Sequence, residues 1–171
     1  MTDGDGITTG GDGVRTGGDG AIAAAARRLA AETGVTRRRD LGSLAARDLE
    51  RFALASGSAL PPDGQAPPLY LSSVMGWSPG PPEAELRPDG SGTDETRGLP
   101  LEGLRLMGAG QDLEFHRPVR AGDHVVEHTT LTDVRHKAGR SGDLLVLRVR
   151  RVFADGSDRP LVTCDETFIA R

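Results

Sequence analysis

The sequence is poor in the residue types that would point to a disulfide-bonded or a nucleic-acid-binding protein. It has one cysteine, Cys164, so it cannot form an intrachain disulfide or a cysteine-based metal site, and we expect a reducing compartment. Aromatic residues make up 4% of the chain, which leaves few platforms for stacking bases. The formal net charge is −4, whereas general nucleic-acid binding needs an excess of Lys and Arg. We therefore expect no nucleic-acid partner.

Long hydrophobic runs are also missing. The longest, Ala21 to Ala26, is far shorter than the roughly 20 residues that cross a bilayer, and Arg27 and Arg28 follow it directly. No cluster of residues in the sequence suggests a metal, a nicotinamide or a flavin. We expect no cofactor, no membrane partner and a cytoplasmic location.

The first twenty residues have almost no large apolar side chains and contain TGGDG twice. Such a segment cannot bury enough surface to offset the entropy of ordering, so we predict that residues 1–20 form a disordered tail. A Gly-rich turn can bind phosphate when a strand precedes it, but no strand is predicted before these repeats. The remaining residues, 21–171, have the length of one domain, and an apolar content of 36% is enough for one modest core.

Two segments favour helices. Residues 21–33 are rich in alanine and are followed by Gly34, a residue typical of helix C-caps, but this helix has little to bury and we expect it to be peripheral. Residues 44–56 place apolar side chains on one side and charged side chains on the other, and Gly57 follows. We predict that this second segment is the core helix.

Residues 58–103 hold most of the prolines of the chain. One apolar patch, residues 69–77, interrupts them as a short helix or strand, and it contains the only Tyr and the only Trp. The part from Ser78 to Gly98 has the composition of a loop, and we predict that it is mobile.

Turn residues divide the C-terminal third of the chain into segments with strand character. Pro118 and Gly122-Asp123 predict a corner and a turn, and Asp155-Gly156 predicts a hairpin. Helix first and antiparallel strands afterwards predict an α+β domain in which an antiparallel sheet wraps around one central helix. The four predicted strands are at about 111–116, 124–137, 143–153 and 160–170.

In the third predicted strand, alternate residues form an apolar face that Arg151 interrupts. We expect Arg148, Arg150 and Arg151 to pair with acidic residues of neighbouring strands, such as Glu127 or Glu166. The apolar residues of this face are Leu145, Leu147, Val149 and Phe153.

Five segments, in this order, resemble the N-terminal, non-catalytic hot-dog half of the MaoC-like dehydratases, that is, of R-specific enoyl thioester hydratases and (3R)-hydroxyacyl thioester dehydratases. They are ARDLERFALASG, APPLYLSSVMGW, GQDLEFHRPVRAGD, KAGRSGDLLVL and VTCDETFIAR, and the resemblance covers roughly residues 36–171 without the Pro-rich loop. It implies a single hot-dog fold. It also implies chemistry on an acyl thioester of coenzyme A or of an acyl carrier protein, in fatty-acid or polyketide metabolism.

The catalytic members of this family carry a G-D-x-N-P-x-H pattern directly after the helix, in which the Asp and the His act on one water. The corresponding run here is GSALPPD, residues 57–63, with Ser58 at the position of the Asp and Asp63 at that of the His. Neither substitute can perform the missing group's acid–base role. The resemblance therefore implies an accessory subunit that shapes the substrate tunnel and is inactive alone. Its partner would be a catalytic MaoC-like hot-dog subunit in a heterodimer, or a second copy in a homodimer.

Two groups of residues are candidates for substrate contact. Tyr70, Met75 and Trp77 suit either an apolar acyl tunnel or packing in the core or a subunit interface. Lys137 and Arg140 lie near a predicted turn, where they suit either the phosphate of coenzyme A or a carrier-protein arm, or a solvated basic turn.

Three alternatives to an accessory subunit stay open. A self-sufficient homodimeric dehydratase would have to use Asp63 or His116, although a histidine fixed beside a strand end is the structural reading of His116. A hot-dog thioesterase would use a carboxylate of the core helix, Asp48 or Glu50, which also suit the first turns of a helix for electrostatic reasons. The third alternative is a non-enzymatic protein that binds acyl thioesters.

Overall fold

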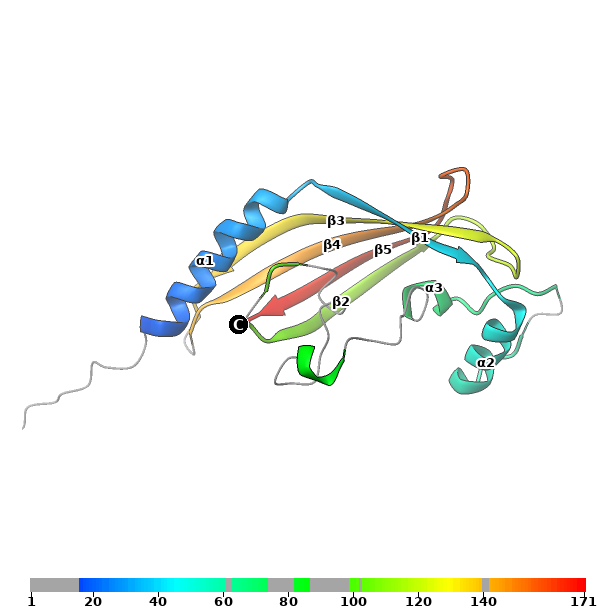
Figure 1. The fold of residues 1–171 in the computed structure, drawn as a ribbon, viewed down its shortest axis with the longest axis horizontal. Coiled ribbons are helices and arrows are strands. Elements are labelled where there is room, and N and C mark those ends of the chain that lie inside the picture. Colours follow the sequence, from blue (N-terminus) through cyan, green and yellow to red (C-terminus); the bar gives the residue numbers. More distant parts are fainter. Residues whose placement is uncertain (1–15, 61–62, 74–81, 87–98, 102, 140–141) are drawn as a thin grey trace, which may run out of the picture.

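The computed structural model describes residues 16–60, 63–73, 82–86, 99–101, 103–139 and 142–171. Five strands form one antiparallel sheet in the order β1-β3-β4-β5-β2 (Figure 1). The strands are β1 (Thr36–Ser43), β2 (Leu106–Phe115), β3 (His124–Lys137), β4 (Leu144–Asp155) and β5 (Pro160–Ala170). The described helices are α1 (Thr16–Glu32), α2 (Ala46–Ser56), α3 (Tyr70–Ser73) and a 3-10 turn, η1 (Glu83–Glu85).

The predicted α+β class and the antiparallel sheet are confirmed. Strands β3 and β5 have the predicted bounds, while β2 begins at Leu106 rather than at residue 111. The Asp155-Gly156 turn closes the β4–β5 hairpin because the Asp155 carboxylate accepts hydrogen bonds from the backbone N–H groups of Ser157 (2.9 Å) and Arg159 (3.1 Å). Period-2 alternation and turn chemistry were therefore sufficient to identify most of the sheet.

Strand β1 was not predicted. Its sequence, TRRRDLGS, has charged residues at successive positions and no apolar alternation. It lies at one edge of the sheet and pairs only with β3, and most of its residues are exposed. An edge strand with so little to bury leaves no hydrophobic pattern in the sequence.

Helix α1 packs on the sheet, so the prediction that it is peripheral was wrong. Ile22, Ala25 and Leu29 lie on one side of the helix and are buried against Leu131 of β3 and Leu147 of β4. The small alanine side chains let the helix approach the sheet closely. The helix begins at Thr16, so residues 16–20 of the predicted tail are helical, whereas residues 1–15 lie outside the described part of the chain.

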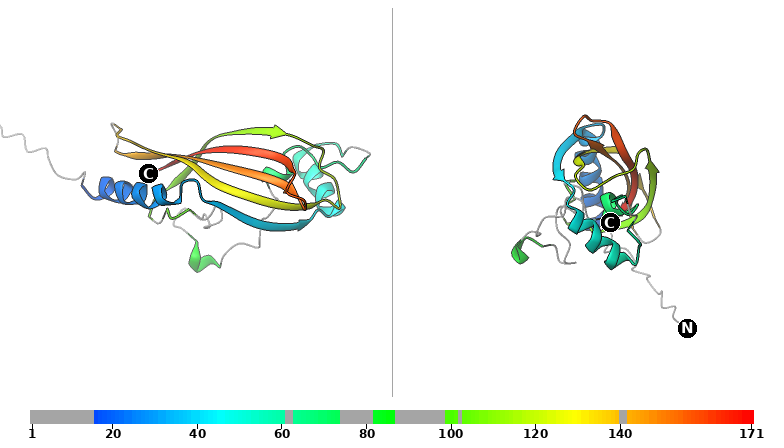
Figure 2. Two further views of the ribbon diagram at one scale, coloured as in Figure 1. Left: turned by 90° about the horizontal axis from the view of Figure 1, so that it is seen from above. Right: turned by 90° about the vertical axis from the view of Figure 1, so that its right-hand side faces the viewer.

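Helix α2 lies toward the opposite end of the sheet from α1 (Figures 1 and 2). Leu49 and Ala53 are its buried residues, and Gly57 ends it in the left-handed conformation (φ 66°), as the sequence predicted. Together with α3 it covers a second apolar cluster, which includes Val125 and Phe153. The sheet thus curves around helices at both ends of its inner face.

The apolar patch at residues 69–77 begins as the short helix α3, and its residues 74–77 lie outside the described part. Of the predicted loop from Ser78 to Gly98, only residues 82–86 are described, and they contain η1. The prediction that this loop is mobile is therefore not tested.

Candidate functional site

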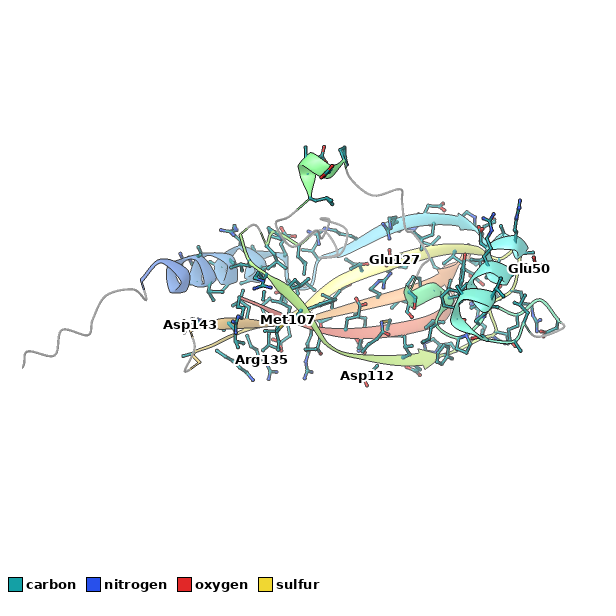
Figure 3. All side chains as sticks on the ribbon, turned by 90° about the horizontal axis from the view of Figure 1, so that it is seen from below. Glu50, Met107, Asp112, Glu127, Arg135 and Asp143 are labelled. Atoms are coloured by element: carbon teal, nitrogen blue, oxygen red, sulfur yellow. The ribbon has the colours of Figure 1, made fainter. Side chains whose placement is uncertain are left out.

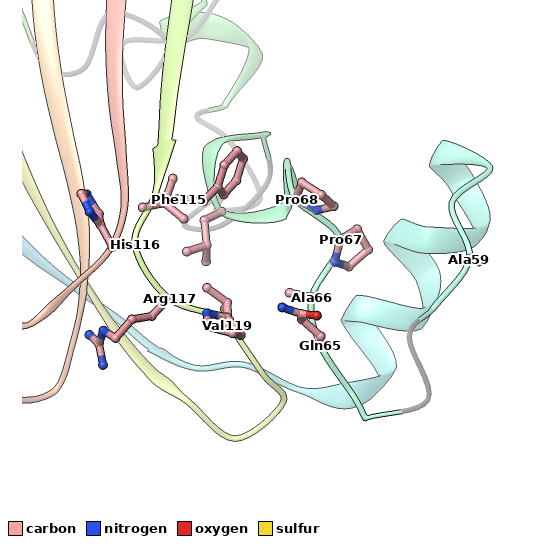
Figure 4. Close-up of a pocket in the computed structure, with 12 residues that line it drawn as sticks. Ala59, Gln65, Ala66, Pro67, Pro68, Phe115, His116, Arg117 and Val119 are labelled. Carbon is pink, nitrogen blue, oxygen red and sulfur yellow. The ribbon is translucent and has the colours of Figure 1, made fainter.

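A pocket of about 460 Å³ opens at the end of the sheet, where two distant parts of the chain meet. One wall comes from the segment between α2 and α3, which contains the GSALPPD run, and the other from the corner between β2 and β3. Figure 4 shows Pro67 and Pro68 across the pocket from Phe115 and Val119. The lining residues are Ala59, Gln65, Ala66, Pro67, Pro68, Leu71, Phe115, His116, Arg117, Pro118, Val119 and Val162.

Backbone hydrogen bonds hold the two walls together. The N–H of Ala66 donates to the carbonyl of Val119 at 2.7 Å, and the N–H of Ala121 donates to the carbonyl of Gly64 at 3.2 Å. The corner turns as predicted after Pro118, with Gly122 in the left-handed region at φ 89°. The shape of the pocket therefore depends on local turn chemistry and on pairing between segments far apart in sequence.

Of the GSALPPD run, Ala59 lines this pocket, and residues 61–62 lie outside the described part of the chain. Ser58, at the position of the family's Asp, is exposed, and its hydroxyl accepts a hydrogen bond from Ser56 at 2.9 Å. Asp63, at the position of the His, forms an ion pair with Arg120 at 2.5 Å. The hydrogen bond from Arg120 lowers the pKa of Asp63 below its ordinary value, so this carboxylate is held as an anion.

His116 and Arg117 line the pocket, but their side chains point away from its centre (Figure 4). The Nε2 of His116 lies 2.8 Å from the Thr163 hydroxyl, and its Nδ1 lies 3.7 Å from the Glu114 carboxylate. No hydrogen bond or ion pair joins His116 to Asp63 in the described structure. The two residues of which a self-sufficient dehydratase would have to use one or the other thus have separate partners.

Arg117 takes part in a cluster that joins the corner to the β4–β5 hairpin. Its NH1 donates to the Asp155 carboxylate at 3.0 Å, and its Nε donates to the carbonyl of Pro160 at 3.1 Å. Partial burial opposes ionisation of Asp155, but hydrogen bonds from the backbone N–H groups of Arg159 and Ser157, and from the Arg117 and Arg159 side chains, outweigh it. They hold the pKa of Asp155 well below its usual range.

Of the residues that the sequence predicted to contact substrate, the structure describes Tyr70 and Lys137. Tyr70 is buried in the core, with its ring edge-on to Phe52 at a centroid distance of 5.4 Å. Burial, and secondarily the charge of Asp48, raise the pKa of Tyr70. Lys137 is exposed at the end of β3. Met75, Trp77 and Arg140 lie outside the described residues.

The two helix carboxylates considered for a thioesterase lie on the exposed side of α2. Asp48 is 3.7 Å from Arg51, one turn further along the helix, and Glu50 is exposed. Neither residue lines the pocket.

Charged side chains cross the inner face of the sheet between its two apolar clusters. Arg151 and Glu127 are each 3% exposed and Glu166 is 5% exposed. Arg151 donates from Nε to Glu127 at 2.6 Å and from NH1 to Glu166 at 3.5 Å. It also donates from NH1 to the carbonyl of Ser72 in α3 at 3.2 Å. The expectation that Arg151 pairs with Glu127 or Glu166 is confirmed.

Residues from the two edge strands extend this arrangement across the whole sheet. On β1, Arg39 donates from Nε to the second Glu127 oxygen at 3.1 Å. On β2, the Gln111 amide donates to Glu166 at 3.4 Å. We call this set the polar band; every strand contributes one residue, and its members are Arg39, Glu127, Arg151, Glu166 and Gln111. Its two cations balance its two anions.

Outside the polar band, Arg150 of β4 forms two hydrogen bonds with Asp165 of β5, at 2.8 and 2.9 Å. Arg148 makes no ion pair with a described residue. In the described part of the chain, no group of three or more His, Cys, Asp or Glu could hold a metal ion. No described helix is long and apolar enough to cross a membrane.

Comparisons with known proteins agree with this fold. Residues 44–164 match the family described as FAS1-like, dehydratase domain region. A chain of the ChsH1–ChsH2 complex from Mycobacterium tuberculosis superposes with a TM-score of 0.61 at 17% identity, covering 88% of this chain and 90% of that one. A chain of the HadBC (3R)-hydroxyacyl-ACP dehydratase complex from the same organism gives 0.58 at 16% identity, covering 81% and 96%.

A MaoC-like dehydratase gives a TM-score of 0.53 at 20% identity, and the match covers 82% of this chain but 42% of that one. No curated protein sequence matches significantly. The family match spans well over half of the chain, and the structural neighbours share its hot-dog fold. The chain therefore belongs to the FAS1-like dehydratase regions of the MaoC-like hot-dog dehydratase family.

Proposed function

We propose that this chain is the accessory subunit of a heteromeric (3R)-hydroxyacyl-thioester dehydratase, or enoyl-thioester hydratase. The observation that carries the proposal is the pocket at the GSALPPD run. It lies where the family's catalytic motif would be, yet none of its described lining residues is a carboxylic acid, and its one histidine points away from the centre. A dehydratase needs an acid and a base that reach the same substrate atoms, so a partner subunit must supply them.

The lining of the pocket suits the apolar part of a thioester substrate. Proline, leucine, valine and phenylalanine side chains form most of its wall, and Gln65 is a neutral polar group at its rim. Such a slot would bind an acyl chain or the pantetheine arm of coenzyme A or of an acyl carrier protein through burial of apolar surface. Lys137 and Arg140 remain proposals for contact with the phosphate groups.

The solved neighbours support a heteromeric assembly. Two of them are chains of complexes named for two different subunits, ChsH1 with ChsH2 and HadB with HadC. The MaoC-like dehydratase that this chain matches over 42% of its length has room for a second region of similar size in one chain. Both arrangements are consistent with a hot-dog domain that functions together with a second domain of similar size.

The proposal is tested by following the hydration of crotonyl coenzyme A spectroscopically. The chain is assayed alone and together with a hot-dog subunit that carries an intact G-D-x-N-P-x-H motif and is encoded next to it. We expect activity only in the mixture, and no loss of that activity on replacing Asp63 or His116 by alanine beyond what altered folding explains. Equal activity of the chain alone would contradict the proposal.

The same assay separates the alternatives. Activity of the chain alone that disappears in Asp63→Ala or His116→Ala would establish a self-sufficient dehydratase. Release of thiol from acyl coenzyme A, lost in Asp48→Ala or Glu50→Ala, would establish a thioesterase. Binding of crotonyl coenzyme A without turnover, even with the second subunit present, would leave a binding protein.

A further inference from the structure

The two walls of the pocket are held by different kinds of contact. The wall from the corner is anchored by Arg117, whose side chain donates to the Asp155 carboxylate at 3.0 Å and to the carbonyl of Pro160 at 3.1 Å. Val119 of the same wall is 7% exposed and packs in the apolar cluster that α2 and α3 cover. The corner is therefore part of the packed body of the sheet.

The opposite wall, residues 63–68, has fewer anchors. Among the described residues, its backbone is joined to the corner by the two hydrogen bonds given above for Ala66 and Ala121. The two prolines that follow Ala66 have no N–H group and can donate no further hydrogen bond. The position of this wall therefore depends on one short bridge.

Arg120 closes this bridge with its side chain. Its NH1 donates to the Asp63 carboxylate at 2.5 Å and also to the carbonyl of Asp63 at 2.9 Å. The other carboxylate oxygen of Asp63 accepts the N–H of Gln65 at 3.4 Å. The backbones of Gln65 and Arg120 pair as an isolated antiparallel bridge. One guanidinium group thus holds both the side chain and the main chain of the wall.

Neither Arg120 nor Asp63 lines the pocket, but each lies close in sequence to residues that do. Gln65 follows Asp63 by two residues, and Val119 directly precedes Arg120. Figure 4 shows Val119 and Gln65 on the two sides of the pocket. A change in the pair therefore reaches the lining through one or two residues of backbone.

The pair between Arg120 and Asp63 is exposed, with 44% and 50% of the two side chains open to solvent. Ion pairs as exposed as this one typically add only about 0–1 kcal/mol to stability. The fold does not depend on such a pair, so what the pair fixes is the local position of the wall. Asp63 stands where the catalytic members of the family carry their histidine, and in this chain that position is used for a structural contact.

We propose that Arg120 and Asp63 are positioning residues that set the width of the pocket for the acyl chain of the substrate. The acyl chain as the occupant rests on the proposed function, whereas the position of the wall rests on the contacts of Arg120.

Loss of the pair would let the wall move away from the corner. Apolar contacts weaken steeply with separation, and a gap of about 0.5–1 Å loses roughly a quarter to a half of each contact energy. A long acyl chain would then bind less tightly. A substrate too short to reach the pocket would not be affected.

The position of the wall is tested on the chain alone by residue-resolved amide hydrogen exchange. Arg120→Met should speed exchange of the Ala66 and Ala121 amides at least about tenfold, because both donate across a bridge that then opens more often. The amide of Gly122 donates to the carbonyl of Leu44 at 2.8 Å, in the same corner but outside the bridge, and should exchange as in the wild type. Unchanged exchange at Ala66 and Ala121 would overturn the proposal.

The effect on substrate is tested in the mixture of the two subunits with dodecenoyl coenzyme A. In Arg120→Met, and equally in Asp63→Asn, KM should rise at least about fivefold while kcat stays within about twofold, since the lost contacts are the same in the ground state and the transition state. The double variant should be no worse than either single one, because the two residues act through one contact. Arg120→Lys, which keeps the charge, should restore part of the binding. Crotonyl coenzyme A should be hydrated with unchanged kcat and KM.

The matched control is another exposed ion pair, between Arg135 and Asp133 at 2.7 Å. Figure 3 shows Arg135 at the opposite end of the sheet from α2, which carries Glu50. Arg135→Met should leave the exchange of the bridge amides and the kinetics of both substrates unchanged. A KM for dodecenoyl coenzyme A that rises as much in Arg135→Met as in Arg120→Met would overturn the proposal, because the loss of any exposed ion pair would then have this effect.

The two measurements separate this proposal from the proposed function. If the wild-type mixture hydrates crotonyl coenzyme A but Arg120→Met does not change exchange at the bridge, the positioning pair is wrong and the function stands. If exchange rises as expected but the wild-type mixture has no hydratase activity, the pair positions the wall and the function is wrong. If exchange rises and KM for dodecenoyl coenzyme A stays the same, the pair does not set the width of the pocket for the substrate.

Discussion

Arg151 is buried with two carboxylates in the middle of an otherwise apolar face, so its removal should cost far more than the loss of one hydrogen bond. Arg151→Met would leave Glu127 with only the exposed Arg39 as a charged partner and remove one donor from Glu166. Removing one partner of a buried ion pair typically lowers the free energy of unfolding by about 3–5 kcal/mol. We expect urea unfolding of Arg151→Met to show a loss of that size.

A second variant, in which the buried charged groups of this site are all replaced by neutral ones, separates the effect of charge from that of hydrogen bonding. Arg151→Met combined with Glu127→Gln and Glu166→Gln leaves no buried charge uncompensated, because Arg39 is exposed, so it should recover most of the lost stability. Arg148→Met, on the exposed side of the same strand, should change stability by no more than about 0.5 kcal/mol. A triple variant as unstable as the single one would mean that the hydrogen-bond geometry, and not the charge balance, holds this region together.

Asp155 provides a pH-dependent prediction. Its pKa is lower in the folded state than in the unfolded chain, so its contribution to stability is fully present above the unfolded pKa of about 3.9 and is lost as the pH falls below it. Asp155→Asn should therefore lower Tm at pH 7, and the difference from wild type should shrink between pH 4 and pH 2. Calorimetry across this range, with Asp112→Asn as a control at an exposed carboxylate without a described partner, measures it.

The sequence held a signal for the polar band. Arg151 interrupts an apolar alternation in β4, and the expectation that it pairs with Glu127 or Glu166 was correct. What the sequence could not show is that Arg39 and Gln111 continue the network from the two outer strands. That depends on strand order, and no pattern within a single strand reports which strand lies beside it.

Helix α1 is the element for which the sequence was least informative. Ile22, Ala25 and Leu29 follow the i, i+3, i+7 spacing of a buried helical stripe, but only two of them are large. The interpretation as a peripheral helix gave too much weight to alanine, which packs closely against a sheet even though it buries little surface. Strand β1 was missed because three arginines in succession carry no apolar period at all.

The packing of α1 can be tested directly. Leu29 has no exposed surface, and removing its side chain opens a cavity next to β3 and β4. Leu29→Ala should cost about 2–5 kcal/mol in urea unfolding, the usual range for a buried leucine. Arg27→Ala, at an exposed position of the same helix, should stay within about 0.5 kcal/mol of wild type. If Leu29→Ala and Arg27→Ala are equally stable, the conclusion that α1 packs on the sheet is wrong.

At the scale of the whole molecule, the pocket lies where Phe115, at the end of β2, meets the segment between α2 and α3, and half of the Phe115 side chain is open to solvent. The two walls of the pocket lie more than 40 residues apart in the sequence, and the backbone hydrogen bonds of Ala66 with Val119 and of Ala121 with Gly64 bring them together. The resemblance to the family located the GSALPPD run, but neither composition nor spacing could predict the cavity beside it.

The lining of the pocket allows one test of the proposed function in the mixture of the two subunits. Ala59 lines the pocket with a small, exposed side chain, whereas Ala55 is equally small and exposed on α2 but does not line it. If the pocket binds the distal part of the acyl chain, Ala59→Trp should lower kcat/KM for a long-chain enoyl coenzyme A at least tenfold, or about 1.4 kcal/mol. It should leave crotonyl coenzyme A, which is too short to reach the pocket, nearly unchanged, and Ala55→Trp should affect neither substrate. An equal loss for both chain lengths would mean that the pocket serves the thioester arm common to both, because a shared arm cannot discriminate by chain length.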